Sequence, residues 1–341
     1  MIEADRHSWE RPTLEEVAEG IWRTPLPLPG DALRAVNAYL VRDGDRYLLV
    51  DCGWNRQESW ERLAEALRRL GAGPDQVRWV FATHVHSDHY GLAGRVRQSS
   101  GAVVSLGRRE RESLLAYRDH PQEARRRTAE RLRQLAGEDV ARLLEAGAAG
   151  SPDSRPPADP DIYLSGGEDL LLGGRELEVL ATPGHTRGHL CLYDRGHQIL
   201  FAGDHVLPQI TPSIGVELHR PGSPLADFLS SLELVGDLPC RLVLPAHGPV
   251  FTDLKGRVLE LAEHHRLRLE ECLEQVAQGA RTAREVADRL PWTRHRRRFQ
   301  DLDPFNQMLA VFESELHLQL LAERGRLRRD LANSSIRYAL P

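Results

Sequence analysis

Lysine is almost absent from this chain of 341 residues, since Lys255 is the only lysine among 45 basic residues. A coding bias toward arginine explains this skew better than selection for phosphate binding, because 50 acidic residues leave a net charge of −5. Clusters of arginine are therefore weak evidence for nucleic-acid binding. The overall charge implies no attraction to a polyanion either.

Cysteine and long apolar runs are also scarce. The four cysteines form no CxxC or other close pair, which gives little support to a thiolate metal site or a disulfide framework and indicates buried thiols in a reducing compartment. No run approaches the roughly 18–20 apolar residues of a membrane span. The charged N-terminus, MIEADRHSWERP, lacks the apolar stretch of a signal peptide. We therefore expect a cytoplasmic protein that does not associate with membranes.

The apolar residues that are present, 41% of the chain, suffice for a full core, and the length suggests two domains or one large domain with an appendage. Short aliphatic runs alternate with amphipathic stretches up to about residue 250. Helices are predicted over 57–70 and 225–235. Strands are predicted over 20–23, 35–41, 47–51, 77–83, 102–106, 177–182, 190–194, 199–202 and 242–245.

Residues 108–160 differ from the rest of this region in composition and pattern. Helical patterns rich in Arg and Glu over 108–118 and 123–145 precede a proline-rich loop. We interpret this stretch as a helical insertion that serves either as a lid or as the surface of a homodimer. After residue 252 the alternation gives way to a long amphipathic helix, a capping box at Thr282–Glu285, a helix start at Asp303-Pro304 and a terminal hairpin pattern. This order predicts a first domain over 1–252 and a winged-helix-like module over 253–341.

Four side chains that can bind a metal follow the apolar run VRWVFAT: His84, His86, Asp88 and His89. In an extended segment His84 and His86 point to the same side, whereas Asp88 and His89 lie where the chain turns. Neutral imidazoles bind zinc at about 2.0–2.1 Å, and a carboxylate neutralises charge. One motif can therefore serve two metal ions.

Zinc takes four ligands, so other segments must contribute. Three further candidates, His185, Asp204 and His247, each follow an apolar run and lie beside glycine. Such a group at the end of a buried strand is costly without a partner. Each alone could be a hydrogen-bonded loop residue, but together they favour metal binding.

The motifs HxHxDH, TPGHTxGH, GD and PAHGP together resemble those of the metallo-β-lactamase superfamily over about residues 17–252. The resemblance implies an α+β fold, a four-layer αββα sandwich with the metals at one edge of the two sheets. It implies one Zn²⁺ on His84, His86 and His185 and a second on Asp88, His89 and His247. Asp204 and a water or hydroxide would bridge the two ions. Iron or manganese could replace zinc.

The predicted function is that of a dinuclear zinc hydrolase acting on a small-molecule ester, thioester or lactone. A metal-bridging hydroxide is the expected nucleophile, because zinc lowers the pKa of bound water to about 7. Asp88 is the predicted catalytic residue, which orients this hydroxide or passes a proton to the leaving group. Asp51 and His189 are predicted to hold ligands or loops by hydrogen bonds. A turn carboxylate and a buried histidine at a strand start remain the alternatives for these two. No substrate-binding residue is predicted.

A nuclease is the alternative function, since related proteins with a similar tail are single-strand endoribonucleases. The run Arg294–Arg298 could contact phosphates, but the tail has no evident aromatic platform for stacking bases. Nucleic acid is therefore the less favoured partner. The glyoxalase II branch has a different C-terminal region that binds glutathione, so a glutathione thioester is not specifically predicted. The complete ligand set argues against a scaffold without catalytic activity.

Overall fold

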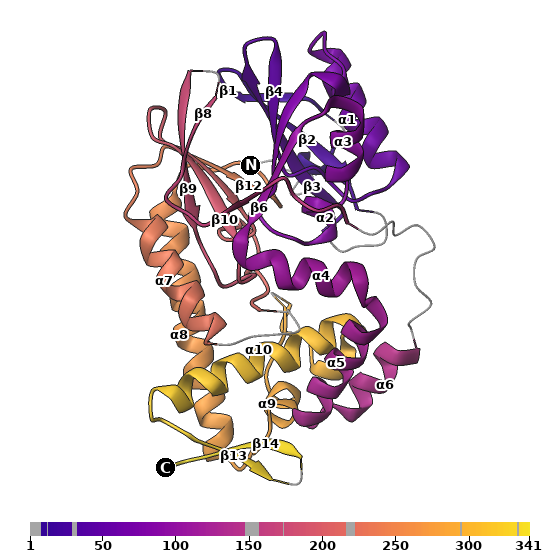
Figure 1. The fold of residues 1–341 in the computed structure, drawn as a ribbon. Helices are drawn as coiled ribbons and strands as arrows, with labels where there is room; N and C mark the ends of the chain where they lie inside the picture. The colour runs from indigo at the N-terminus through magenta and orange to yellow at the C-terminus, as the bar shows by residue number, and fades with distance from the viewer. Residues whose placement is uncertain are drawn as a thin grey trace.

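Two β-sheets packed face to face form one half of the molecule (Figure 1). The computed structural model describes residues 8–11, 13–28, 33–146, 157–172, 174–215, 222–293, 295–332 and 334–341. The first sheet runs in sequence order through β1 (Glu15–Ala18), β2 (Ile21–Pro27), β3 (Ala35–Asp43), β4 (Arg46–Val50), β5 (Val77–Phe81), β6 (Val103–Gly107) and β7 (Ile162–Leu164). The second has the order β12 (Leu242–Pro245), β11 (Ile199–Gly203), β10 (Leu190–Asp194), β9 (Arg175–Ala181) and β8 (Asp169–Leu172).

Helices cover the outer face of each sheet and complete four layers. Helices α1 (Gln57–Arg69) and α3 (Ala93–Ser100) share a core with the first sheet, and α7 (Pro224–Gly236) and α8 (Leu254–Ala277) share one with the second. A third core lies between the sheets and includes Tyr39, Phe81 and Phe201. The predicted αββα sandwich is confirmed.

The sequence prediction missed the short strands β1, β7 and β8 and the helices α2 (Ser87–Tyr90) and α3. The three strands are only three or four residues long and lie at the edges of the sheets, where they bury few side chains, so their short sequence patterns did not mark them as strands. The helical pattern predicted over 123–145 is confirmed, but it is interrupted at residues 135–137. The chain forms α5 (Pro121–Gln134) and α6 (Glu138–Ala146), because Ala136 has a φ of 63° that ends the first helix before Gly137.

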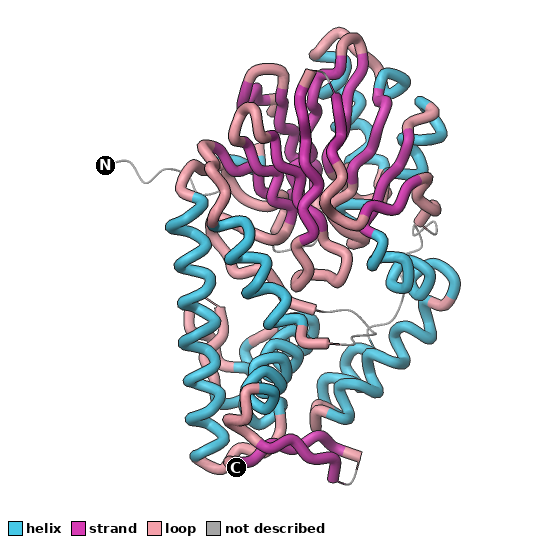
Figure 2. The backbone as a smooth tube through the Cα atoms, turned by 60° about the vertical axis from the view of Figure 1, so that its left-hand side comes forward, coloured by secondary structure: helices cyan, strands magenta, loops and turns pink. Residues whose placement is uncertain are grey.

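Helices dominate the other half of the molecule (Figure 2). There the insertion helices α4 (Arg111–Asp119), α5 and α6 meet α9 (Ala283–Arg289), α10 (Pro304–Glu323) and the hairpin of β13 (Arg328–Ala332) and β14 (Ser335–Ala339). Arg131 of α5 pairs with the buried Glu315 of α10, and Arg284 of α9 pairs with Asp139 at 3.0 Å. The insertion therefore packs on the C-terminal module.

The C-terminal module follows the predicted order of elements. Thr282 Oγ1 accepts from Glu285 N at 3.2 Å while Glu285 Oε2 accepts from Thr282 N at 3.2 Å, so the predicted capping box is present. The winged-helix assignment and the boundary at 252/253 stay predictions, since one core joins α5, α6, α7 and α8–α10. Arg294 lies outside the described residues, and Arg296–Arg298 are exposed on a turn where Arg298 pairs with Asp301 at 3.1 Å. Among the described helices, none is long and apolar enough to cross a lipid bilayer.

Two stacked histidines lie inside this module. The rings of His265 on α8 and His317 on α10 are 5.3 Å apart, and both are buried. His317 Nδ1–H donates to the carbonyl of Glu313 at 2.7 Å, so its Nε2 accepts from His265 Nδ1–H at 3.2 Å. Burial lowers the pKa of His317 to about 3 and also holds the pKa of His265 well below its usual value. Both rings are therefore neutral in the folded protein.

These histidines should make the folded state sensitive to acid. An unfolded chain binds their protons below about pH 6.5, so stability is fully present above that pH and is lost as the pH falls toward 3. The parent protein should lose unfolding free energy when the pH falls from 7.5 to 5.0. In His317→Gln this loss should be smaller by about 2 kcal/mol. Urea unfolding at both pH values measures this difference. The exposed His295→Gln is the control, and an equal pH dependence in the parent and His317→Gln would contradict the prediction.

Candidate metal centre

The seven predicted ligands converge from four segments on one edge of the sandwich, toward the helical half. The segment after β5 carries His84, His86, Asp88 and His89, and the β9–β10 loop carries His185. Asp204 directly follows β11, and His247 follows β12. The three groups of neighbouring ligand atoms contain all seven side chains: His84, His86 and His185; His84, His89 and Asp204; and Asp88, His89 and His247.

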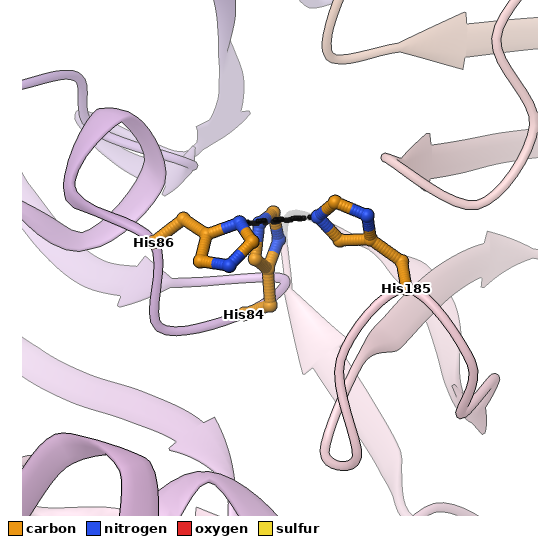
Figure 3. A group of neighbouring side chains, drawn as sticks. All are labelled: His84, His86 and His185. Carbon is orange, nitrogen blue, oxygen red and sulfur yellow. Dashed lines mark hydrogen bonds between the residues drawn. The ribbon is translucent and has the colours of Figure 1, made fainter. Parts of the chain in front are cut away.

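Three imidazole nitrogens form a tight triangle at this edge (Figure 3). His84 Nε2 lies 2.9 Å from His86 Nδ1, and His185 Nε2 lies 3.2 Å from His84 Nε2 and 3.1 Å from His86 Nδ1. Four ligands placed tetrahedrally at about 2.0–2.1 Å from a zinc ion would be roughly 3.3 Å apart. The triangle therefore has the size of three corners of such a tetrahedron.

Hydrogen bonds on the far side of the rings set the tautomers. His185 Nδ1–H donates to the carbonyl of Ser213 at 2.6 Å, and His84 Nδ1–H donates to Thr83 Oγ1 at 3.1 Å. In both rings Nε2 therefore carries no hydrogen, and its lone pair points into the triangle. Burial, together with His185, lowers the pKa of His86 to about 3, and burial also lowers the pKa of His84 and of His185. The rings are thus in the neutral form that binds metal.

A second group lies beside the first. His247 Nδ1–H donates to the carbonyl of Ala35 at 2.8 Å, which leaves Nε2 at 3.4 Å from Asp88 Oδ2. His89 Nε2 lies 3.3 Å from the same oxygen. His89 Nε2 and His247 Nε2 are buried, yet neither has a hydrogen bond of good geometry among the described residues. Buried nitrogens that lack a hydrogen-bond partner and face a carboxylate are the groups expected around a bound cation.

Asp204 contacts both groups. Its Oδ2 lies 3.5 Å from His185 Nε2 and 3.6 Å from His89 Nε2, and its buried Oδ1 lies 3.4 Å from His247 Nε2. Burial opposes ionisation, but His247 and His89 hold the pKa of Asp204 well below its usual range. Burial likewise opposes protonation of His247, but Asp204 and Asp88 outweigh it and raise the pKa of His247 to about 10. The second group therefore carries protons at neutral pH, unlike the first.

Asp51 and His189 support the ligands from behind. Asp51 is buried and accepts hydrogen bonds from His89 Nδ1 at 2.8 Å, from Thr83 N at 2.8 Å and from Thr83 Oγ1 at 3.0 Å. His189 Nδ1–H donates to Thr182 Oγ1 at 2.8 Å, and its Nε2 accepts from Asp204 N at 3.1 Å. Because both nitrogens of His189 are engaged, it orients the backbone of Asp204 and is not itself available to a metal.

The sequence prediction missed the supporting residues on helix α7. A Cβ on Gly184 would lie 2.5 Å from Phe228 Cβ, so the loop that carries His185 packs on the helix without a side chain between them. Ser231 Oγ donates to the carbonyl of Pro183 at 2.8 Å. His205, the residue after Asp204, is fully buried with its ring 5.1 Å from that of Phe228. The glycine at 184 was the only sequence signal of this close approach.

Comparisons with known proteins agree with this geometry. A family model described as "Metallo-beta-lactamase superfamily" matches residues 31–247. The "Acyl-coenzyme A thioesterase MBLAC2" of Gallus gallus is 32% identical over 63% of this chain and 73% of its own length. The "Atrochrysone carboxyl ACP thioesterase nsrC" of Aspergillus novofumigatus is 25% identical over 81% of this chain and 68% of its own length.

Two solved structures resemble nearly the whole chain. The "metallo-beta-lactamase family protein TTHA1429" of Thermus thermophilus superposes with a TM-score of 0.73 at 29% identity and covers 96% of this chain and 100% of its own. A "Beta-lactamase domain protein" from Burkholderia ambifaria has a TM-score of 0.76 at 27% identity, covering 97% and 94%. The likeness therefore extends over the helical half as well as the sandwich.

The hydrogen bond from His89 to Asp51 can be tested by Asp51→Asn. The amide cannot accept from both Thr83 and His89 as the carboxylate does, so metal affinity should fall by about 10–100-fold. Competition with a chromophoric chelator measures the affinity. Asp194→Asn is the matched control, because Asp194 is a buried carboxylate at the other end of β10 that accepts from Arg175 at 2.6 Å. An equal loss of affinity in both variants would contradict a specific role for Asp51.

Proposed function

This chain belongs to the metallo-beta-lactamase superfamily, and from that premise we propose that it is a metal-dependent hydrolase of thioesters. The observation that carries the proposal is the donor set of five histidines and two aspartates at one edge of the sandwich. Curated relatives over most of that domain are named as thioesterases of acyl-coenzyme A or of an acyl carrier protein. Oxygen esters and lactones are the other carbonyl substrates compatible with the site.

We assign His84, His86 and His185 to one metal ion, Asp88, His89 and His247 to a second, and Asp204 to both. Zinc is the proposed metal because imidazole and carboxylate ligands suit it, with iron and manganese as alternatives. When bound, such ions lower the pKa of water and polarise a carbonyl oxygen. The hydrogen bonds of Asp51, Ser213 and Ala35 to the ligand rings keep the ring nitrogens aimed at the site.

The proposed catalytic residue is Asp88. Its side chain is 22% exposed, whereas the side chains of His89 and His247 that flank it are at most 2% exposed. The Asp88 side chain is therefore more accessible to solvent than the two imidazoles that flank it. The flanking His89 and His247 overcome its burial and hold the pKa of Asp88 well below its usual value, so Asp88 is ionised at neutral pH. We assign it to orienting the attacking water and holding the proton that the water loses. The attack forms the new carbon–oxygen bond, and the proton passes to the sulfur when the carbon–sulfur bond then breaks.

A substrate panel tests this function. The zinc-loaded protein should hydrolyse acyl thioesters faster than matched oxygen esters, lactones or single-stranded RNA. His185→Ala or Asp204→Asn should lower thioester kcat/KM by at least about 100-fold, because each removes a ligand from the site. His197→Ala, remote from the site on the turn after β10, is the control. Thioester turnover unaffected by both variants and by chelation would refute the proposal.

Metal loading should release protons from one group only. Because the pKa of His247 is raised to about 10, a metal ion at Asp88, His89 and His247 must displace a proton at pH 7. The triangle of His84, His86 and His185 is already neutral and should release little. Calorimetric titrations of the metal-free protein in buffers of different ionisation enthalpy count these protons. We expect one step without release and one with about one proton or more. Two steps with equal release would contradict the assignment.

A further inference from the structure

A pocket of about 540 Å³ lies beside the loop that carries His185. Pro183, Gly188 and His189 of that loop form one wall, α7 contributes Asp227 and Ser231, and the residues after β6 form another side. The volume falls within the range of about 300–1,000 Å³ that is typical of small-molecule sites. None of the seven proposed metal ligands lines it, so it is a separate pocket adjoining the metal centre.

Three arginines line this pocket against a single carboxylate, that of Asp227. Arg108 hydrogen-bonds to neutral groups, Ser165 Oγ at 3.0 Å and the carbonyl of Tyr163 at 3.4 Å. Arg109 is exposed and interacts electrostatically with Asp227, but it has no hydrogen bond or ion pair with any described residue. Arg187 pairs at 2.6 Å with Glu112, which is itself 64% exposed. The pocket therefore has an excess of positive charge.

Arginine is abundant in this chain, so the pairing of the arginines matters more than their presence. Some exposed arginines on helices pair with acidic residues one turn away, as Arg126 and Arg127 do with Glu123, whereas Arg69 and Arg324 have no ion pair with a described residue. Arg108 and Arg109 are distinguished by their position, because neither has an ion pair with a described residue and both line the same pocket. Their charge is available to an anionic ligand.

We propose that this pocket binds the phosphate groups of a coenzyme A thioester, an inference that rests on the proposed thioesterase function. Guanidinium groups match phosphate oxygens in paired hydrogen bonds. In coenzyme A the pantetheine arm separates the sulfur from the phosphates, so a phosphate subsite must adjoin the reacting centre without coinciding with it. Arg187 meets this condition, because it lies in the pocket only two residues after His185.

The pocket suits a nucleotide better than a carrier protein. Leu164, Leu190 and Leu234 add apolar surface beside the arginines, on which an adenine ring can pack. An acyl carrier protein presents only one phosphodiester and no base. Three guanidinium groups and a volume of this size therefore favour the free coenzyme over the protein-bound arm.

Two measurements on the full chain test the assignment. Calorimetry with adenosine 3′,5′-bisphosphate, the nucleotide part of coenzyme A without thioester or pyrophosphate, should detect binding that weakens at least 10-fold in Arg109→Gln and in Arg187→Gln. The preference for acetyl-coenzyme A over S-acetylpantetheine, as a ratio of kcat/KM values, should fall at least 10-fold in both. Arg127→Gln, at an exposed arginine on α5 outside the pocket, should stay within twofold of the parent in each assay. Because Arg187 is only 24% exposed, melting temperatures serve as the folding check for each variant.

The outcomes separate the two proposals. Bisphosphate binding that depends on Arg109, in a protein without thioesterase activity, would support the pocket and refute the function. Equal turnover of the coenzyme A and pantetheine thioesters, with no effect of either pocket variant, would refute the pocket and leave the function standing. A preference for acyl carrier protein over acetyl-coenzyme A, or cleavage of single-stranded RNA that requires Arg109, would overturn the assignment to coenzyme A.

Discussion

Lone pairs that face one another across about 3 Å in a buried site repel, and the edge of this sandwich is built around that unfavourable arrangement. His84, His86 and His185 aim three nitrogens at a common point, and hydrogen bonds behind two of the rings leave no proton on the inward nitrogens of His84 and His185. Such a cluster is stable only if the surrounding fold prevents the rings from turning away or if a cation neutralises them. Much of the architecture near the site serves the first condition.

Both sheets contribute to that restraint. Asp51, at the end of β4, ties Thr83 and His89 to the first sheet, while His189, at the start of β10, ties the backbone of Asp204 to the second. His247 donates to Ala35 on β3, so a ligand of the second sheet is oriented by the first. The site therefore depends on the face-to-face packing of the sheets, and disruption of their shared core would separate the two halves of the donor set.

The helical half extends this restraint outward. Helix α7 contacts the His185 loop through Phe228 and Ser231, and the ring of Phe228 also lies 5.4 Å from His265 of the C-terminal module. One continuous core joins α7, the insertion helices α5 and α6, and α8–α10. The insertion and the module, which the sequence indicates as separate additions, thus support the loop that carries a proposed ligand. This arrangement gives a physical reason for the extent of the structural likeness, which covers nearly the whole chain.

The sequence alone determined which residues form the donor set, because His84, His86, Asp88, His89, His185, Asp204 and His247 each follow an apolar run in a recognisable local motif. It also indicated most of the strands, since hydrophobic periodicity is a local property, while the sandwich was implied by the resemblance of the motifs to those of the metallo-β-lactamase superfamily. Only the tertiary structure decided what depends on contacts between distant segments. These contacts set the tautomers of the rings, the support of His185 by Phe228 and the break between α5 and α6. They also bring Arg108 and Arg109 beside Arg187 around one pocket. Residues more than 70 positions apart meet there, and no pattern within either segment encodes that meeting.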